Sequence, residues 1–166
     1  MPVVAEHLRF DALRRLGLSD LLLRLSAGEP VHPLLALRCD APPYFSYHGA
    51  EPPAGPPFVP LWDCGDTVTG VRPGDGGLEF VAYAVEGGEP DVLARTEAGL
   101  WATVFLDLYE ADDTLDVDGL RPAAAAVGFT HLDGLIAAYE RADTRTFDGR
   151  ERFTREVVRW IDSGAT

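Results

Sequence analysis

The stretch that decides the fold is "FVPLWDCGDTVTGVRPGDGGLEFVAYAVE", Phe58 to Glu86. It opens with two short runs rich in β-favouring residues, Phe58–Asp63 and Asp66–Val71, with only Cys64 and Gly65 between them. A glycine in so short a connection accepts a positive φ, so Cys64–Gly65 predicts a tight hairpin turn.

A second turn and a third strand follow directly. The glycine-rich segment Arg72–Gly77 predicts the turn, and Leu78–Glu86 predicts the strand. Alternate residues of this third strand are apolar on both faces, which is typical of a strand in the centre of a sheet. We therefore expect the three strands to form an antiparallel meander.

Helical patterns stand on both sides of this meander, with apolar residues at helical spacing and polar residues or glycines at the ends. Ser19 is the expected N-cap of the second helix, Thr130 or Asp133 starts the fourth, and Asp148 caps the last. The expected helices cover Ala5–Gly17, Asp20–Gly28, Val92–Glu110, His131–Asp143 and Gly149–Asp162.

These patterns predict an α+β fold, a central antiparallel β-sheet (meander) flanked by N-terminal and C-terminal helices. The chain has 166 residues, of which 46% are hydrophobic. That length and composition suit a single α+β domain over residues 1–166. We expect the helix that contains Trp101 to pack on the meander, and the side chains of Trp62, Trp101 and Trp160 to lie in the core.

A proline-rich passage, Pro30–Pro60, precedes the sheet. Its Pro-Pro pairs argue against helix and for an irregular segment. Four aromatic residues are expected to anchor this passage to the core, or in part to remain exposed for binding: Tyr44, Phe45, Tyr47 and Phe58.

Charge is distributed unevenly along the chain, whose net charge is −13. Between Asp40 and Asp118 there are 16 acidic residues, against only Arg72 and Arg95. The flanking parts are nearly balanced, and the chain has no lysine. Such an acidic middle segment repels nucleic acid and anionic membranes and favours a basic partner, although simple solubility accounts for it equally well.

The remaining global features favour a cytoplasmic protein. No apolar run is long enough for a transmembrane helix, and the N-terminus lacks the pattern of a secretory signal. We expect Cys39 and Cys64 to be free thiols, although their pairing stays open.

The sequence contains residues for three kinds of catalytic or metal site. The acids of "EADDTLDVDG", among them Asp112, Asp113, Asp116 and Asp118, could attract a hard cation, but they lack the spacing of a calcium loop. The cysteines and histidines show no zinc spacing. Ser46, His48 and Cys64 lack the setting of a nucleophile, and the aspartates beside Cys64 disfavour its thiolate. We expect no enzyme activity, no metal and no cofactor.

The block Phe58–Glu110 resembles the SUKH superfamily of bacterial domains. The resemblance lies in "FVPLWDCGDTVTGV", "LEFVAYAVE" and "VLARTEAGLWATVFLDLYE", with Gly65-Asp66 as the turn and Leu93-Ala94 leading into the helix. It implies a mixed α+β fold without catalytic residues. It also implies an immunity protein that binds and neutralises a toxin, often a nuclease, inside the producing cell.

Charge and resemblance together predict a non-enzymatic binding protein for a basic toxin. The acids expected to contact the partner cluster at the turns of the meander: Asp63, Asp66, Asp75, Glu86, Glu89 and Asp91. Two other functions stay open. One is a metal-dependent hydrolase that uses the acids of Asp112–Asp118, and the other is a regulatory or self-associating domain. The oligomeric state is left undetermined.

Overall fold

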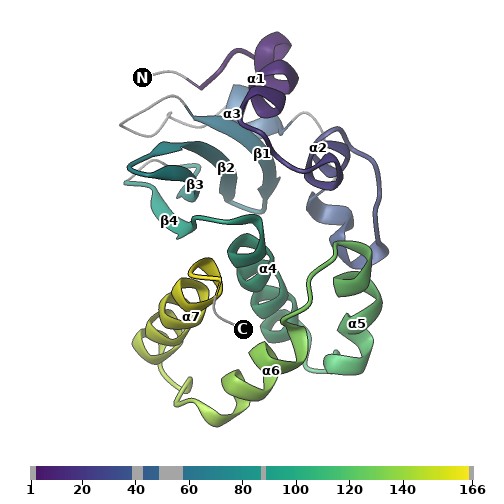
Figure 1. Ribbon diagram of the computed structural model, residues 1–166, viewed down its shortest axis with the longest axis vertical. Coiled ribbons are helices and arrows are strands. Elements are labelled where there is room, and N and C mark those ends of the chain that lie inside the picture. Colours follow the sequence, from purple (N-terminus) through teal and green to yellow (C-terminus); the bar gives the residue numbers. More distant parts are fainter. Residues whose placement is uncertain (1–2, 39–42, 49–57, 87–88, 165–166) are drawn as a thin grey trace. The chain divides into compact units, whose positions relative to one another are not determined.

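The computed structural model describes residues 3–38, 43–48, 58–86 and 89–164 (Figure 1). The chain divides into two compact units, Met1–Arg95 and Thr96–Thr166. Within the described residues, one four-stranded antiparallel sheet stands between helices that precede and follow it in the chain, which confirms the α+β class. The grouping of all 166 residues into one domain, with the helix around Trp101 packed on the meander, stays a prediction.

The sheet belongs to the first unit and has the strand order β1-β2-β3-β4. Its strands are β1 (Val59–Cys64), β2 (Thr67–Gly74), β3 (Gly77–Ala84) and β4 (Asp91–Ala94). All three strand pairs are antiparallel, so the predicted meander and the central place of β3 are confirmed. The fourth strand was not predicted, because its residues read as the start of the following helix.

Both predicted turns are shifted. Cys64 pairs with Thr67, so the first turn is Gly65–Asp66, and Gly65 has the positive φ of 64° that such a turn requires. The second turn is Asp75–Gly76, because β2 continues through the residues that were predicted to form the turn and Gly74 pairs with Gly77.

One face of the sheet is built around Phe58, which packs with Val68, Val81 and Tyr83 in a buried cluster. The Phe58 ring lies directly over Gly70. A Cβ atom on Gly70 would stand 2.3 Å from that ring, so only glycine fits this position of β2. The ring contacts Tyr83 edge-on, with 5.2 Å between the ring centroids.

Short helices precede the sheet. The 3₁₀ turn η1 (Glu6–Leu8) leads into α1 (Arg9–Arg15). The next helix, α2 (Asp20–Ser26), has Ser19 as its N-cap, as predicted. The Ser19 hydroxyl accepts a hydrogen bond from the Leu22 N–H.

The proline-rich passage contains two short helical segments, η2 (Pro33–Arg38) and α3 (Tyr44–His48). The prediction that its prolines exclude helix was therefore wrong. Pro33 occupies the first position of η2, where a proline removes no helical hydrogen bond. Tyr44 is 65% exposed and Phe58 is buried, whereas the side chain of Phe45 and residues 39–42 and 49–57 lie outside the described part of the chain.

The buried side chain of Arg9 joins these helices to the sheet. A β-bulge between Pro60 and Trp62 turns the carbonyl oxygens of Pro60 and Leu61 to the outer edge of β1. Arg9 donates from Nε to the Pro60 oxygen and from Nη2 to the Leu61 oxygen, both at 2.7 Å. Its Nη1 donates to the Ser26 oxygen at the end of α2, at 2.9 Å.

The second unit consists of four helices: α4 (Glu97–Ala111), α5 (Val117–Ala126), α6 (Leu132–Arg141) and α7 (Phe147–Asp162). Helix α4 begins at Glu97 with Thr96 as its N-cap, later in the chain than predicted. Helix α5 was missed because the sequence of its first turn was interpreted as part of an acidic loop. His131 stands at the N-cap position of α6 and Thr146 caps α7, in place of the predicted residues.

The ends of this unit are tied together within it. Asp162, in the last turn of α7, accepts hydrogen bonds from the backbone N–H and the hydroxyl of Thr96 at 3.0 and 2.7 Å. Trp62, in the first unit, and Trp101 are buried as expected, but Trp160 is 48% exposed, so the core assignment of Trp160 was wrong. Trp160 instead borders the ring of His131 on the surface.

We expect the substitution Arg9→Met to lower the free energy of unfolding by about 3 kcal/mol, because it leaves three buried carbonyl oxygens without a donor. Urea unfolding measures this loss. The control is Arg15→Met, an exposed position on the same helix, which should change stability by about 0.5 kcal/mol or less. Equal losses for the two variants would contradict the role given to Arg9.

Candidate functional site

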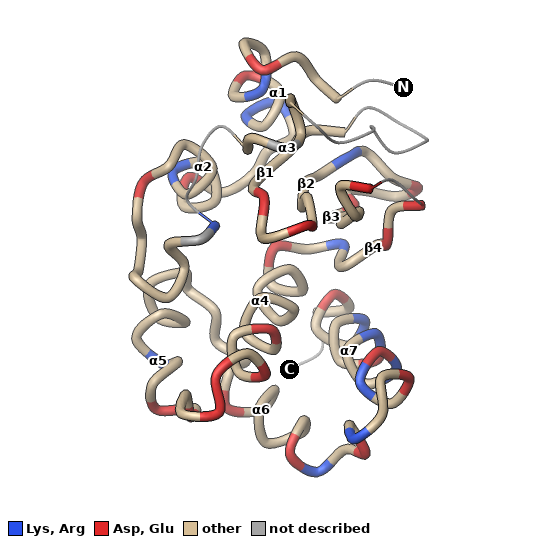
Figure 2. Tube along the Cα trace, turned by 180° about the vertical axis from the view of Figure 1, so that it is seen from behind, with Lys and Arg blue, Asp and Glu red and all other residues tan. Residues whose placement is uncertain are grey.

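Four exposed carboxylates gather at one end of the meander. Asp66 lies in the β1–β2 turn, Glu86 and Glu89 lie in the β3–β4 connection, and Asp91 begins β4. The antiparallel register places both connections at the same end of the sheet. There the backbone N–H of Val85 donates to the backbone oxygen of Asp66 at 2.8 Å and links the two connections. We call these four residues the acidic end (Figure 2).

The other two predicted contact residues lie elsewhere. Asp75 is exposed in the β2–β3 turn, at the opposite end of the meander. Asp63 is half-buried in β1, where its Oδ1 accepts a hydrogen bond from the Ser46 hydroxyl at 3.2 Å. Asp63 thus takes part in internal hydrogen bonding, and the structure brings together four of the six acids.

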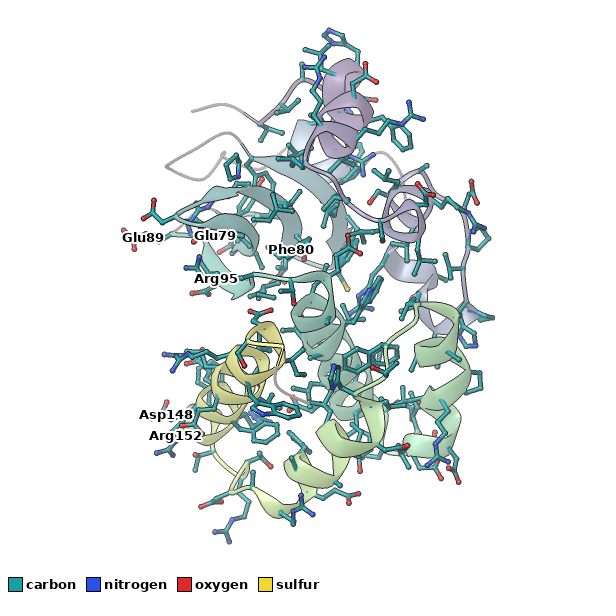
Figure 3. All side chains as sticks on the ribbon, in the orientation of Figure 1. Glu79, Phe80, Glu89, Arg95, Asp148 and Arg152 are labelled. Carbon is teal, nitrogen blue, oxygen red and sulfur yellow. The ribbon has the colours of Figure 1, made fainter. Side chains whose placement is uncertain are left out.

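The two arginines of the acidic segment are both directed at another carboxylate. Arg72 and Arg95 form ion pairs with Glu79 at 3.2 and 3.0 Å, and the Glu79 side chain is only 12% exposed. Figure 3 shows Arg95 close to Glu79, whereas Glu89 points away from the sheet. Among the described residues, no ion pair reaches any member of the acidic end, so its four charges are not offset locally.

A polar cluster lies inside the first unit, between α3 and the sheet. Burial raises the pKa of Tyr47 to about 12, and the positive charge of Arg9 opposes that shift. Burial also raises the pKa of Tyr83 and lowers that of Arg9. The hydroxyls of Tyr47 and Tyr83 are buried and find no hydrogen-bond partner of good geometry in the described part of the chain. These groups are structural, since all of them are shielded from solvent.

The acids between the end of α4 and the first turn of α5 take part in local structure. Asp112 ends α4 and accepts hydrogen bonds from the backbone and hydroxyl of Thr114, which lower its pKa. Asp116 is the N-cap of α5 and accepts from the Gly119 N–H at 2.9 Å. Asp118 pairs with an arginine one turn further along α5. These carboxylates are therefore engaged in local structure, as expected of a helix-capping loop.

No group of three or more metal-ligating side chains occurs within residues 3–38, 43–48, 58–86 and 89–164. Cys64 is a half-buried free thiol next to the first turn, and Cys39 lies outside these ranges. Ser46 is buried and bonded to Asp63, and the ring of His48 lies against Tyr44. Neither serine nor cysteine has the arrangement of an activated nucleophile.

One surface feature escaped the sequence reasoning. Val92, in the unpredicted strand β4, is 43% exposed, and β4 has a strand neighbour on one side only. The sequence signal was ambiguous, because Asp91 and Thr96 are both N-cap residues and only the structure shows that Thr96 caps α4 and leaves Asp91–Ala94 for a strand.

Comparison with known proteins finds no matching family model, no similar curated protein and no similar solved structure. None of the helices in the described residues is long and apolar enough to cross a membrane.

We expect Asp116→Ala to lower the free energy of unfolding by about 1 kcal/mol, because α5 loses its N-cap. Asp113→Ala, at an exposed neighbouring position, should have a much smaller effect. Thermal unfolding with and without added Ca²⁺, Mg²⁺ or Mn²⁺ checks this role. If a cation stabilised the wild type and lost this effect in the Asp116 variant, the residue would be a metal ligand.

We expect Tyr47→Phe to remove one tyrosinate signal that develops near pH 12 in the absorbance titration of the folded protein. The pKa of an unfolded tyrosine is about 10. The protonated form of Tyr47 therefore stabilises the fold fully below about pH 10, and this contribution is lost as the pH rises to about 12.

The urea midpoint of the Tyr47→Phe variant should accordingly fall less steeply with pH in this range than that of the wild type. A lost signal centred near pH 10 would show instead that the Tyr47 phenol is open to solvent.

Proposed function

We propose that this chain is a non-enzymatic binding protein of immunity type, which neutralises a basic toxin through its acidic end. The observation that carries the proposal is the set of four exposed carboxylates at Asp66, Glu86, Glu89 and Asp91. They project from the turns of one antiparallel sheet and have no ion-pair partner among the described residues.

Such a surface suits recognition of positive charge. Exposed charges of one sign raise the rate of encounter with a partner of the opposite sign, and salt weakens this effect. Asp66 lies in a two-residue turn between paired strands and Asp91 begins β4, so the sheet fixes the backbone of these two residues before binding. The Arg72–Glu79–Arg95 ion pairs keep the only two cations of the acidic segment at Glu79.

The resemblance of Phe58–Glu110 to the SUKH superfamily supports the same proposal. It implies an immunity protein that acts in the cytoplasm of a bacterial cell, without a cofactor. The partner class is then a toxin with a basic surface, and a nuclease is the strongest candidate because its substrate groove must attract phosphates. Nucleic acid and membranes are not partners in this proposal, since the acidic surface repels both.

The test is capture of proteins from the native host at low salt, with the immobilised chain as bait and mass spectrometry as the readout. We expect the wild type to retain a basic protein. A variant that combines Asp66→Asn, Glu86→Gln, Glu89→Gln and Asp91→Asn should lose that protein, and raising the ionic strength should release it from the wild type.

The matched control combines Asp11→Asn, Asp75→Asn, Asp113→Asn and Glu156→Gln. These exposed residues carry the same total charge but lie outside the acidic end, so this variant should retain the partner. Recovery of no basic protein by the wild type, or equal losses with both variants, would refute the proposal.

A further inference from the structure

The two outer edges of the sheet differ. The edge of β1 is occupied, because the Val4 N–H donates to the Phe58 oxygen at 3.0 Å and Arg9 binds the oxygens of Pro60 and Leu61. Within the first unit, the edge of β4 faces no strand, and no backbone hydrogen bond from the described residues of this unit reaches it. An unpaired strand edge presents backbone donors and acceptors to any extended segment.

The register identifies the residue that faces outward. In an antiparallel pair, hydrogen-bonded and non-hydrogen-bonded positions alternate. The hydrogen bond from the Val85 N–H to the Asp66 oxygen shows that Val85 occupies a hydrogen-bonded position relative to β2. Ala82, three residues earlier, therefore occupies a non-hydrogen-bonded position relative to β2, and its N–H and C=O point toward β4. Ala82 pairs with Asp91, and the next residue of β4, Val92, therefore directs its N–H and C=O away from the sheet.

The position of Pro73 agrees with this alternation. Pro73 pairs with Leu78 at a non-hydrogen-bonded position, where its missing N–H costs nothing in the β2–β3 ladder. The same alternation that places Pro73 at a non-hydrogen-bonded position directs the Val92 N–H away from β3, at the outer edge of β4.

The charges beside this edge select the occupant. Asp91 lies immediately before Val92, and Glu86 and Glu89 lie earlier in the chain, in the β3–β4 connection, all exposed. A second copy of β4 added in parallel and in register would bring these carboxylates against their own copies, which like-charge repulsion disfavours. A segment that carries lysine or arginine would meet them favourably, and the exposed Val92 side chain offers an apolar contact.

We infer that β4 is the docking edge for an extended, basic segment of the partner protein, which adds to the sheet as a fifth strand and bonds to the backbone of Val92. This inference rests on the proposed function and specifies how the partner is held. Main-chain hydrogen bonds would supply affinity, and the carboxylates of the acidic end would select the basic sequence.

The test uses the ¹⁵N-labelled full chain and a short synthetic peptide that alternates lysine with valine. The same peptide with prolines in place of the central valines serves as a control that cannot pair as a strand. We expect the first peptide to slow hydrogen exchange of the Val92 amide at least about tenfold at saturation, a factor that corresponds to one added hydrogen bond. The proline peptide should leave this exchange unchanged.

Two variants separate backbone from side chain. Val92→Pro removes the outward N–H and should weaken binding of the lysine–valine peptide about tenfold, whereas Val92→Thr keeps the N–H and should bind like the wild type. Thermal unfolding checks that both variants fold. If Val92→Pro does not fold, the exchange measurement on the wild type still decides.

The two proposals fail separately. Binding of the peptide without protection of the Val92 amide, or a native basic partner that Val92→Pro captures as well as the wild type, would overturn strand addition and leave the acidic end as the binding surface. Protection of Val92 by the peptide, with no basic partner in the native host, would support the edge and refute the proposed function. A dimer in sedimentation that Val92→Pro abolishes would overturn the choice of occupant.

Discussion

The first unit depends on one guanidinium group. Arg9 fills the β-bulge of β1 and holds the end of α2, so one side chain fixes two helices and the first strand to each other. The bulge would otherwise expose two carbonyl oxygens to a dry interior, a cost that no apolar side chain could offset. The bulge shifts the pairing of β1 with β2 between Pro60 and Trp62, whereas β2 and β3 pair without any shift.

Around the sheet, two cations are engaged with internal acceptors. Arg9 binds backbone oxygens and Arg72 binds a shielded carboxylate, while the carboxylates of the turns face solvent. The arginines of the N-terminal helices Arg14, Arg15 and Arg24 stay exposed, so this arrangement is confined to the sheet. The placement of single charges, more than the net charge of the sequence, therefore determines the local field at the ends of the strands.

Local rules predicted the parts of the fold that depend on local physics. The alternation in Leu78–Glu86 identified the central strand, and Ser19 marked a helix start, because neighbouring residues determine both. The role of Arg9 could not be predicted, since two of its three acceptors lie more than fifty positions away, on either side of a bulge. Nor could β4, whose four residues are held by pairing with β3 and have little strand signal of their own.

The candidate site was predicted in part for the same reason. Turn residues are exposed wherever they occur, so Asp66 and Glu86 followed from the pattern, but Asp63 was misplaced because only the fold shows that Ser46 covers it. Helix α5 was missed because Asp116 and Asp118 resemble part of a cation-binding loop, whereas in the structure Asp116 caps α5 and Asp118 pairs with Arg121.

The closed edge of β1 also limits how far any strand pairing can spread. A sheet that is open on both sides can accept one neighbour after another and grow into a filament. Here the Val4 and Arg9 bonds occupy one side, so the sheet can be extended only once, and each copy ends whatever assembly it joins. The hydrogen bonds that stabilise the fold would thus limit the inferred strand addition to one strand per chain.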